Sequence, residues 1–197
     1  MTNKDRNKMN ILIGCECSQT VCKAFRERGH NAFSCDIEPC YGGKPEWHIL
    51  GDCREYIYGD VNFYTQNGDE HYVQQFDIII AHPKKRAIDF FLLFKRLRCR
   101  WCIENPPGLM SKLYRKPDQT IQPFWFGDCA TKAMCLWLHG LPLLEKTKVV
   151  EIPAPSKLPR KDRAKSRSKT FDGIANAMAQ QWGNIDNIVN KQKELNF

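Results

Sequence analysis

The sequence predicts an α/β fold with a mostly parallel central sheet and helices on both faces of that sheet. Two segments, 76–83 and 101–108, begin as continuous apolar runs and end in compact polar corners. Continuous apolar runs are typical of strands that a parallel sheet buries on both faces. The chain has 197 residues, of which 42% are hydrophobic, and this is enough for one globular domain with a proper core. We therefore expect a single domain over residues 1–197.

The N-terminal segment predicts a strand, a loop, a helix and a second strand. Residues 10–14 form an apolar strand that ends at Gly14, and a polar loop leads to a helix for which Ser18 is a plausible N-cap. The second strand, 31–35, runs into Asp36. This order places loop amides and a helix N-terminus near a ligand, and a carboxylate where it can bind ribose hydroxyls. It predicts a nucleotide-ribose site, with a simple turn-capping role as the alternative for Asp36.

The rest of the chain continues the alternation of strands and helices. Within the helix that follows the strand at 76–83, Ile88, Phe91 and Leu92 are expected to form the apolar face. Further expected elements are a short strand at 49–52, the helix at 86–97, a late strand at 135–138 and a final amphipathic helix from Ile174. Trp182 lies on the apolar stripe of that final helix and is expected to belong to the core.

Both polar corners should meet at one edge of the sheet. In open α/β sheets the ligand binds beyond the carboxyl ends of the strands. Glu104 and Asn105 would then place a carboxylate beside an amide, a pair that can recognise the edge of a planar, hydrogen-bonding molecule. The corner after Pro83 contains no evident catalytic group.

Positive charge is concentrated near the C-terminus. The net charge is +8, and the stretch 157–169 holds seven basic residues and one acid. Such a block attracts phosphates, although a solvated loop that only aids solubility is the alternative. We expect the basic loop 153–170 to belong to the domain and to bind a polyanion. Its candidate contact residues are Lys157, Arg160, Lys161, Arg163, Lys165 and Arg167.

The ten cysteines are expected to be free thiols. The pair Cys99 and Cys102 has metal-ligand spacing, but no second pair matches it, so we expect no metal. No apolar run approaches the roughly 20 residues that span a bilayer, and no signal peptide is evident. We therefore expect no membrane association and a cytoplasmic location. Oligomeric state cannot be read from these residues.

The N-terminal motifs stand in the order of the cofactor motifs of a known family. Residues 13–18 form a glycine-bearing loop, Asp36 ends the second strand, and Gly51–Cys53 follows the third. The chain resembles the DNA cytosine-5 methyltransferases over nearly its whole length, in particular the small phage-type members. The resemblance implies a Rossmann-like S-adenosylmethionine-dependent methyltransferase fold, with Asp36 on the cofactor ribose and Asp52 facing the adenine amino group. The implied cofactor-binding residues are Gly14, Cys15, Glu16, Asp36, Ile37, Asp52 and Cys53.

The later motifs resemble those that bind and modify the base. Residues 76–83 are similar to the strand that delivers a catalytic Pro-Cys pair, and 103–106 looks like the Glu-Asn motif that grips the target cytosine. Residues 131–138 resemble a later basic strand, with Lys132 in place of the usual arginine. The resemblance implies double-stranded DNA as partner, a flipped target base, Lys132 as a DNA contact, and a bacterial host's cytoplasm if the protein is phage-encoded. The implied catalytic residues are Pro83, Glu104 and Asn105.

The implied chemistry requires a nucleophile that this sequence does not contain. In the family, a cysteine thiolate adds to carbon 6 of cytosine while an acid hydrogen-bonds ring nitrogen 3, and carbon 5 then attacks the methyl sulfonium. Glu104 suits the acid, but Pro83 is followed by Lys84 and not by cysteine. Either methylation chemistry has been lost, or a segment is missing there, which predicts a chain break between Pro83 and Lys84.

The sequence is consistent with three functions. The leading one is a DNA methyltransferase acting on carbon 5 of cytosine. The second is a catalytically silent methyltransferase-like protein that binds nucleic acid or cofactor, for example a phage counter-defence factor. The third, a small-molecule α/β enzyme, leaves the basic stretch 157–169 unexplained.

Overall fold

The computed structural model describes residues 8–83, 87–151 and 170–185. Its strands are β1 (Asn10–Gly14), β2 (Asn31–Asp36), β3 (His48–Leu50), β4 (Val61–Tyr64), β5 (Glu70–Val73), β6 (Ile78–Ala81), β7 (Arg100–Asn105), β8 (Gln119–Ile121) and β9 (Met134–His139). Its α-helices are α1 (Thr20–Arg26), α2 (Ala87–Phe94), α3 (Met110–Leu113) and α5 (Asp172–Trp182). Short 3-10 helices are η2 (Pro45–Trp47), η3 (Cys53–Glu55) and η4 (Pro123–Trp125).

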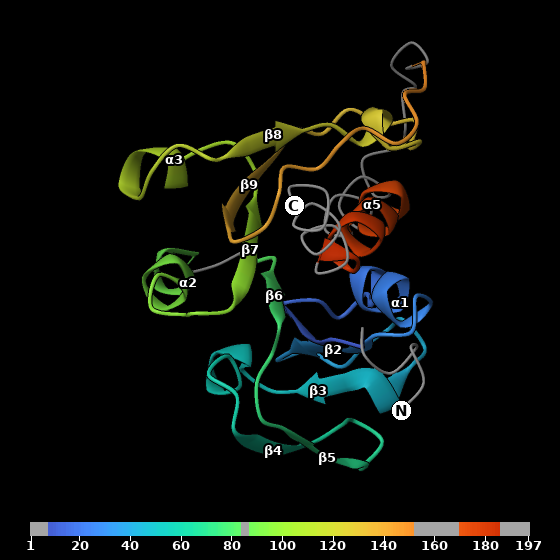
Figure 1. The fold of residues 1–197 in the computed structure, drawn as a ribbon, viewed down its shortest axis with the longest axis vertical. Coiled ribbons are helices and arrows are strands. Elements are labelled where there is room, and N and C mark those ends of the chain that lie inside the picture. Colours follow the sequence, from blue (N-terminus) through green and yellow to red (C-terminus); the bar gives the residue numbers. More distant parts are fainter. Residues whose placement is uncertain (1–7, 84–86, 152–169, 186–197) are drawn as a thin grey trace, which may run out of the picture.

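The fold is mixed α/β, built on a mostly parallel seven-stranded sheet (Figure 1). The strand order is β3-β2-β1-β6-β7-β9-β8, and the first five strands run parallel to one another. β9 is antiparallel to both of its neighbours, β7 and β8. The predicted parallel sheet is therefore confirmed, and the strand predicted at 135–138 is the one that runs in the opposite direction.

The path of the chain through the sheet defines where a ligand can bind. From β1 the chain moves outward to β2 and β3, and it then returns to form β6 on the other side of β1. The direction of winding thus reverses between β1 and β6. In open α/β sheets, ligands bind in the crevice outside the carboxyl ends of the strands at such a switch point.

Two hydrophobic clusters hold the sheet to its helices. Successive strand residues point to opposite faces, so Ile11 and Ile13 belong to one cluster and Leu12 to the other. Side chains of α1 and α5 pack in the first cluster, and those of α2 pack in the second. Trp182 of α5 is fully buried, which confirms its predicted core position.

Two local features differ from the sequence expectations. The N-cap of α1 is Gln19 and not Ser18. In α2, Leu92 is 57% exposed, and the buried face is formed by Phe90, Phe91 and Phe94. Phe94 lies four residues after Phe90 and three residues after Phe91, which is the spacing of one helix face, whereas Leu92 lies off that face.

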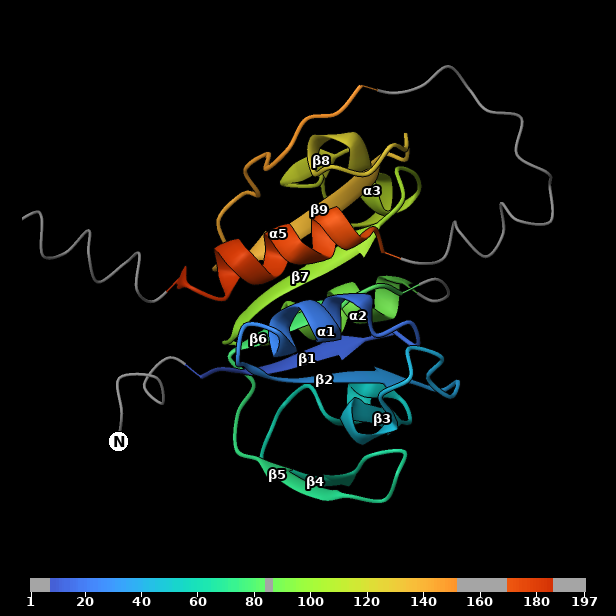
Figure 2. The same cartoon turned by 90° about the vertical axis from the view of Figure 1, so that its right-hand side faces the viewer.

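A β-hairpin lies between β3 and β6, where no strand was predicted. β4 and β5 form a separate two-stranded antiparallel sheet at the β3 edge of the molecule (Figures 1 and 2). Phe63 and Val73 are buried while Tyr64 and Tyr72 are exposed, the alternation expected of a strand pair with one face packed on the core. Across the described part of the chain, every helix is too short or too polar to cross a membrane.

Candidate functional site

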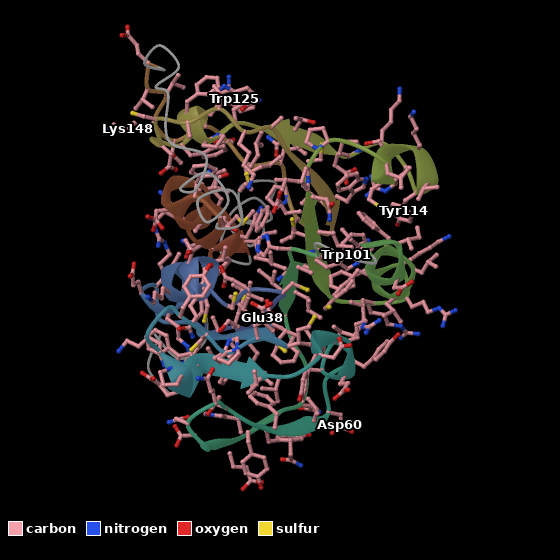
Figure 3. The ribbon with its side chains drawn as sticks, turned by 180° about the vertical axis from the view of Figure 1, so that it is seen from behind. Glu38, Asp60, Trp101, Tyr114, Trp125 and Lys148 are labelled. Carbon is pink, nitrogen blue, oxygen red and sulfur yellow. The ribbon has the colours of Figure 1, made fainter. Side chains whose placement is uncertain are left out.

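A cavity of about 260 Å³ opens at the carboxyl ends of β1, β2 and β3. It lies at the carboxyl edge of the sheet, where a ligand is predicted, but on the β2 side of β1 and not between β1 and β6. Figure 3 shows the side chains of this region around Glu38, which follows β2. The cavity is lined by Cys15, Cys17, Cys35, Asp36, Ile37, Glu38, Gly51, Asp52, Cys53, Arg54 and Phe90.

Most of the residues expected to bind cofactor lie on this cavity. Asp36 ends β2, and its carboxylate accepts a hydrogen bond from the Glu38 backbone N–H at 3.2 Å, a turn-capping contact that leaves further lone pairs free for a ligand. Ile37 is 74% exposed at the cavity wall, so an apolar surface is available to a ligand ring. The others that line the cavity are Cys15, Asp52 and Cys53.

Asp52 lines the cavity with its carboxylate already engaged. Arg54 Nε lies 2.9 Å from both carboxylate oxygens of Asp52, and a second guanidinium nitrogen pairs with the same group. This hydrogen bonding raises the pKa of the Arg54 guanidinium. Arg54 also lies over the Phe90 ring at 5.9 Å. Neither Arg54 nor Phe90 was expected at a ligand site. Phe90 reaches the cavity from α2, which is distant in the chain from the other lining residues.

Gly14 acts through its backbone and does not line the cavity. A Cβ atom at residue 14 would lie 2.6 Å from Cys53 Sγ, which is closer than real contacts allow. The absence of a side chain therefore lets η3 pack directly on the end of β1. Gly14 was predicted to bind the cofactor; it does not line the cavity, and the structure gives it a packing role.

Glu16 points away from the cavity and into the N-terminus of α1. Its carboxylate accepts hydrogen bonds from Val21 N at 2.7 Å and Cys22 N at 3.1 Å. Only 4% of Glu16 is exposed. It therefore satisfies two of the amides that have no partner within the first turn of a helix, and negative charge there is favoured by the helix dipole.

The two polar corners meet at one edge, as the sequence predicts. Asn105 Nδ2 donates to the carbonyl oxygen of Pro83 at 2.8 Å. His82 Nδ1 lies 3.1 Å from Glu104 Oε2. The ends of β6 and β7 are thus joined by two side-chain contacts that the sequence order alone does not reveal.

His82 and Glu104 form a buried pair at this edge. Their exposed fractions are 9% and 8%. Burial by itself lowers the pKa of His82, but the hydrogen bond and charge of Glu104 outweigh burial, and the net pKa is raised. His82 Nε2 is buried and has no hydrogen-bond partner among the described residues. The sequence contained this histidine beside Pro83, but only the fold brings it to a carboxylate.

The cavity and the His82–Glu104 pair are adjacent. The backbone N–H of His82 donates to the carbonyl oxygen of Gly14 at 3.0 Å, immediately before the cavity residue Cys15. The ends of β1, β6 and β7 therefore form one continuous edge. One part of this edge is a cavity, and the other presents a carboxylate and an amide.

The expected nucleic-acid contacts are only partly described. Lys132 precedes β9 and does not lie in a strand; its ammonium is 5.8 Å from the centre of the Phe171 ring, and its backbone N–H donates to Gln122. Residues 153–169 of the basic loop lie outside the described residues, and so do Lys84 to Arg86, where the chain break was expected. The basic residues outside the description are Lys157, Arg160, Lys161, Arg163, Lys165 and Arg167.

All ten cysteines are free thiols. Within residues 8–83, 87–151 and 170–185, no three His, Cys, Asp or Glu side chains converge so as to hold a metal ion.

Comparison with known proteins gives no relative from which a function can be transferred. No protein-family model matches the chain, and no curated protein matches its sequence. Function must therefore be inferred from the residues and their geometry.

Proposed function

We propose that this chain is an S-adenosylmethionine-binding protein of the DNA cytosine-5 methyltransferase type, with a Rossmann-like fold and helices on both faces of the sheet. The observation that carries the proposal is the continuous edge formed by β1, β6 and β7. A cavity with a strand-end carboxylate, Asp36, stands beside a buried acid and an amide, Glu104 and Asn105. Cofactor and base would occupy neighbouring parts of this edge.

The cavity has chemistry suited to an adenosylated sulfonium. Asp36 can accept hydrogen bonds from ribose hydroxyls. Ile37 and Phe90 offer apolar contacts for the adenine ring. Asp36, Glu38 and Asp52 place three acids around the cavity against one arginine, Arg54, and this balance favours a cationic ligand. S-adenosylmethionine, when bound, supplies the methyl group.

The Glu104 edge has chemistry suited to a cytosine. Glu104, whose Oε2 lies 3.1 Å from His82 Nδ1, can hydrogen-bond ring nitrogen 3 of the base, and this contact makes the ring more susceptible to addition. Asn105 holds the Pro83 carbonyl and so fixes the position of the β6 end relative to Glu104. The base must leave the duplex to reach these groups.

A catalytically silent form of the same protein is the second candidate, and a specific observation favours it. Pro83 is followed by Lys84, and the family's nucleophile is a cysteine at that place. Cys102 lies in β7 below Glu104 but is fully buried, and burial raises its pKa, so it is a poor substitute. We therefore expect this chain to bind cofactor and DNA without transferring a methyl group.

Calorimetry tests the cofactor site. S-adenosylmethionine and its demethylated product should both bind, and Asp36→Ala should weaken binding about tenfold or more, because a hydrogen bond to a charged group contributes roughly 1.5–3 kcal/mol. Glu70→Ala, an exposed acid on β5, is the matched control and should leave affinity unchanged. Equal affinity of Asp36→Ala and wild type would exclude the proposed ribose contact.

DNA binding and methyl transfer are tested separately. Affinity for duplex DNA should fall steeply with salt, and charge reversal in the stretch 157–167 should weaken all sequences about equally. Salt-independent affinity, or none at low ionic strength, would exclude DNA as partner. Nucleoside mass spectrometry should detect no 5-methylcytosine after incubation with the cofactor. Its appearance would show that another residue of this chain serves as nucleophile.

A further inference from the structure

Four of the ten cysteines line the cavity beside β1, β2 and β3. Cys35 is fully buried, and its thiol donates to the Gly51 carbonyl oxygen at 3.4 Å. Cys15 is only partly buried, and Cys53 lies opposite it in η3. So many thiols around one cavity are not required by hydrogen bonding to a nucleotide, which oxygen and nitrogen groups perform better.

Cys15 and Cys53 are held together by the packing of η3 on β1. Cys53 Sγ occupies the space that a side chain on Gly14 would need. Gly14 is the residue immediately before Cys15. Cys15 and Cys53 both line the same cavity. Cys15 has a backbone φ of +60°, in the left-handed region that non-glycine residues rarely occupy. The loop is therefore held in an uncommon conformation while its side chain lines the cavity.

The two sulfurs differ in reactivity. Hydrogen bonding with Cys53 lowers the pKa of Cys15 and outweighs burial and the nearby charges of Asp36 and Asp52, which act in the opposite direction. The same hydrogen bond, together with burial, raises the pKa of Cys53. Reactive cysteines are typically partly exposed thiols with a lowered pKa, and oxidation-sensitive ones often have a second cysteine in contact. Cys15 fits the attacking role, and Cys53 fits the resolving role.

We propose that Cys15 and Cys53 form a redox-sensitive pair, which a peroxide converts into a disulfide that closes the cavity to its adenosyl ligand. The formation of the disulfide is independent of the ligand, whereas the closure of the cavity rests on the proposed function.

The chemistry balances with peroxide as the oxidant. The Cys15 thiolate attacks one peroxide oxygen, the O–O bond breaks, and hydroxide leaves, so that Cys15 becomes a sulfenic acid. The Cys53 sulfur then attacks the sulfenic sulfur, the S–S bond forms, and the sulfenic oxygen leaves as water with the Cys53 proton. Two electrons pass from the two sulfurs to peroxide, which is reduced to two molecules of water.

Closure follows from the geometry of the bond. A disulfide brings its sulfurs to about 2.05 Å, much closer than two hydrogen-bonded thiols. Because both side chains line the cavity, their bond ties the β1 loop to η3 across its wall. A bound ligand that occupies the cavity should in turn protect the pair from oxidation.

Peptide mapping of the purified protein tests the pair directly. After treatment with hydrogen peroxide and alkylation, cleavage after basic residues and after glutamate isolates Cys15 in peptide 9–16 and Cys53 in peptide 47–54. Each peptide contains no other cysteine. We expect these two peptides to be cross-linked, dithiothreitol to separate them, and saturating S-adenosylhomocysteine to slow the cross-link at least fivefold.

Two variants and a binding measurement complete the test. Cys129→Ser, which removes an exposed cysteine outside the cavity, should cross-link as wild type does. Cys53→Ser should instead accumulate a sulfenic acid at Cys15 that dimedone labels. Oxidised wild type should bind S-adenosylhomocysteine at least tenfold more weakly than reduced protein.

The outcomes separate the inference from the proposed function. Absence of the 9–16 to 47–54 cross-link in peroxide-treated wild type would overturn the redox pair, whatever the protein binds. A cross-link with unchanged ligand affinity would overturn the closure. If reduced protein binds no adenosyl ligand, the proposed function fails, while the cross-link still decides whether Cys15 and Cys53 form the pair.

Discussion

Glu16→Ala should destabilise the protein even when no ligand is bound. The Glu16 carboxylate accepts from the backbone amides of Val21 and Cys22 at 2.7 and 3.1 Å. The N-cap residue, Gln19, has a left-handed backbone and makes no side-chain cap bond of its own. Glu16 is therefore the side chain that satisfies these two amides in the first turn of α1.

The expected loss follows from these two contacts. A hydrogen bond to a charged group contributes roughly 1.5–3 kcal/mol, so two set an upper range of about 3–6 kcal/mol. Removing the carboxylate also removes the cost of burying a charge, which offsets part of that sum. We expect Glu16→Ala to lower the free energy of unfolding by about 2–4 kcal/mol. Glu16→Gln, which keeps one acceptor oxygen and no charge, should lose about half as much.

Urea unfolding of the ligand-free protein measures this loss. The matched control is Glu27→Ala, an exposed acid at the other end of α1, which should change stability by no more than about 0.5 kcal/mol. If Glu16→Ala leaves the stability of the free protein unchanged and weakens S-adenosylmethionine binding, Glu16 is a cofactor contact. The helix-capping role would then be wrong.

Three further predictions concern the free protein and are measured by urea unfolding. Gly14→Ala should lower the free energy of unfolding by about 1–3 kcal/mol, because the new Cβ would lie 2.6 Å from Cys53 Sγ. In a Cys53→Ala background this loss should be smaller, and an equal loss would refute the steric cause. The pKa of His82 is raised in the folded protein, so the stability that its contact with Glu104 contributes is present below the unfolded-state pKa of about 6.5 and is lost as pH rises through the folded-state pKa. The difference in free energy of unfolding between wild type and His82→Asn should therefore shrink above about pH 6.5. A constant difference would contradict this. Asp118→Asn should lower the free energy of unfolding by about 1 kcal/mol, because the Asp118 carboxylate accepts a hydrogen bond from the Leu138 backbone N–H at 2.6 Å and pairs with Arg115. An unchanged free energy of unfolding would show that bonds to water replace these contacts.

The sequence alone located most strands of the parallel part of the sheet and the acids at their ends. Continuous apolar runs such as 78–81 are typical of strands that a parallel sheet buries on both faces, so their composition encodes their place in the fold. The order strand, loop, helix, strand and acid is likewise local, and it located Asp36 at the end of β2 before any contact was known. Trp182, on an apolar helical stripe, was assigned to the core for the same reason.

Only the tertiary structure decided which partner each of these acids has. Glu16 turns to the amides of α1, Asp52 is held by Arg54, and Glu104 meets His82 from a different strand. The hydrophobic pattern specifies that a segment is a strand, but its neighbours in the sheet depend on how the whole chain winds. A carboxylate's role depends on the donors within about 3 Å of it, and those donors come from segments that only the packed fold brings together.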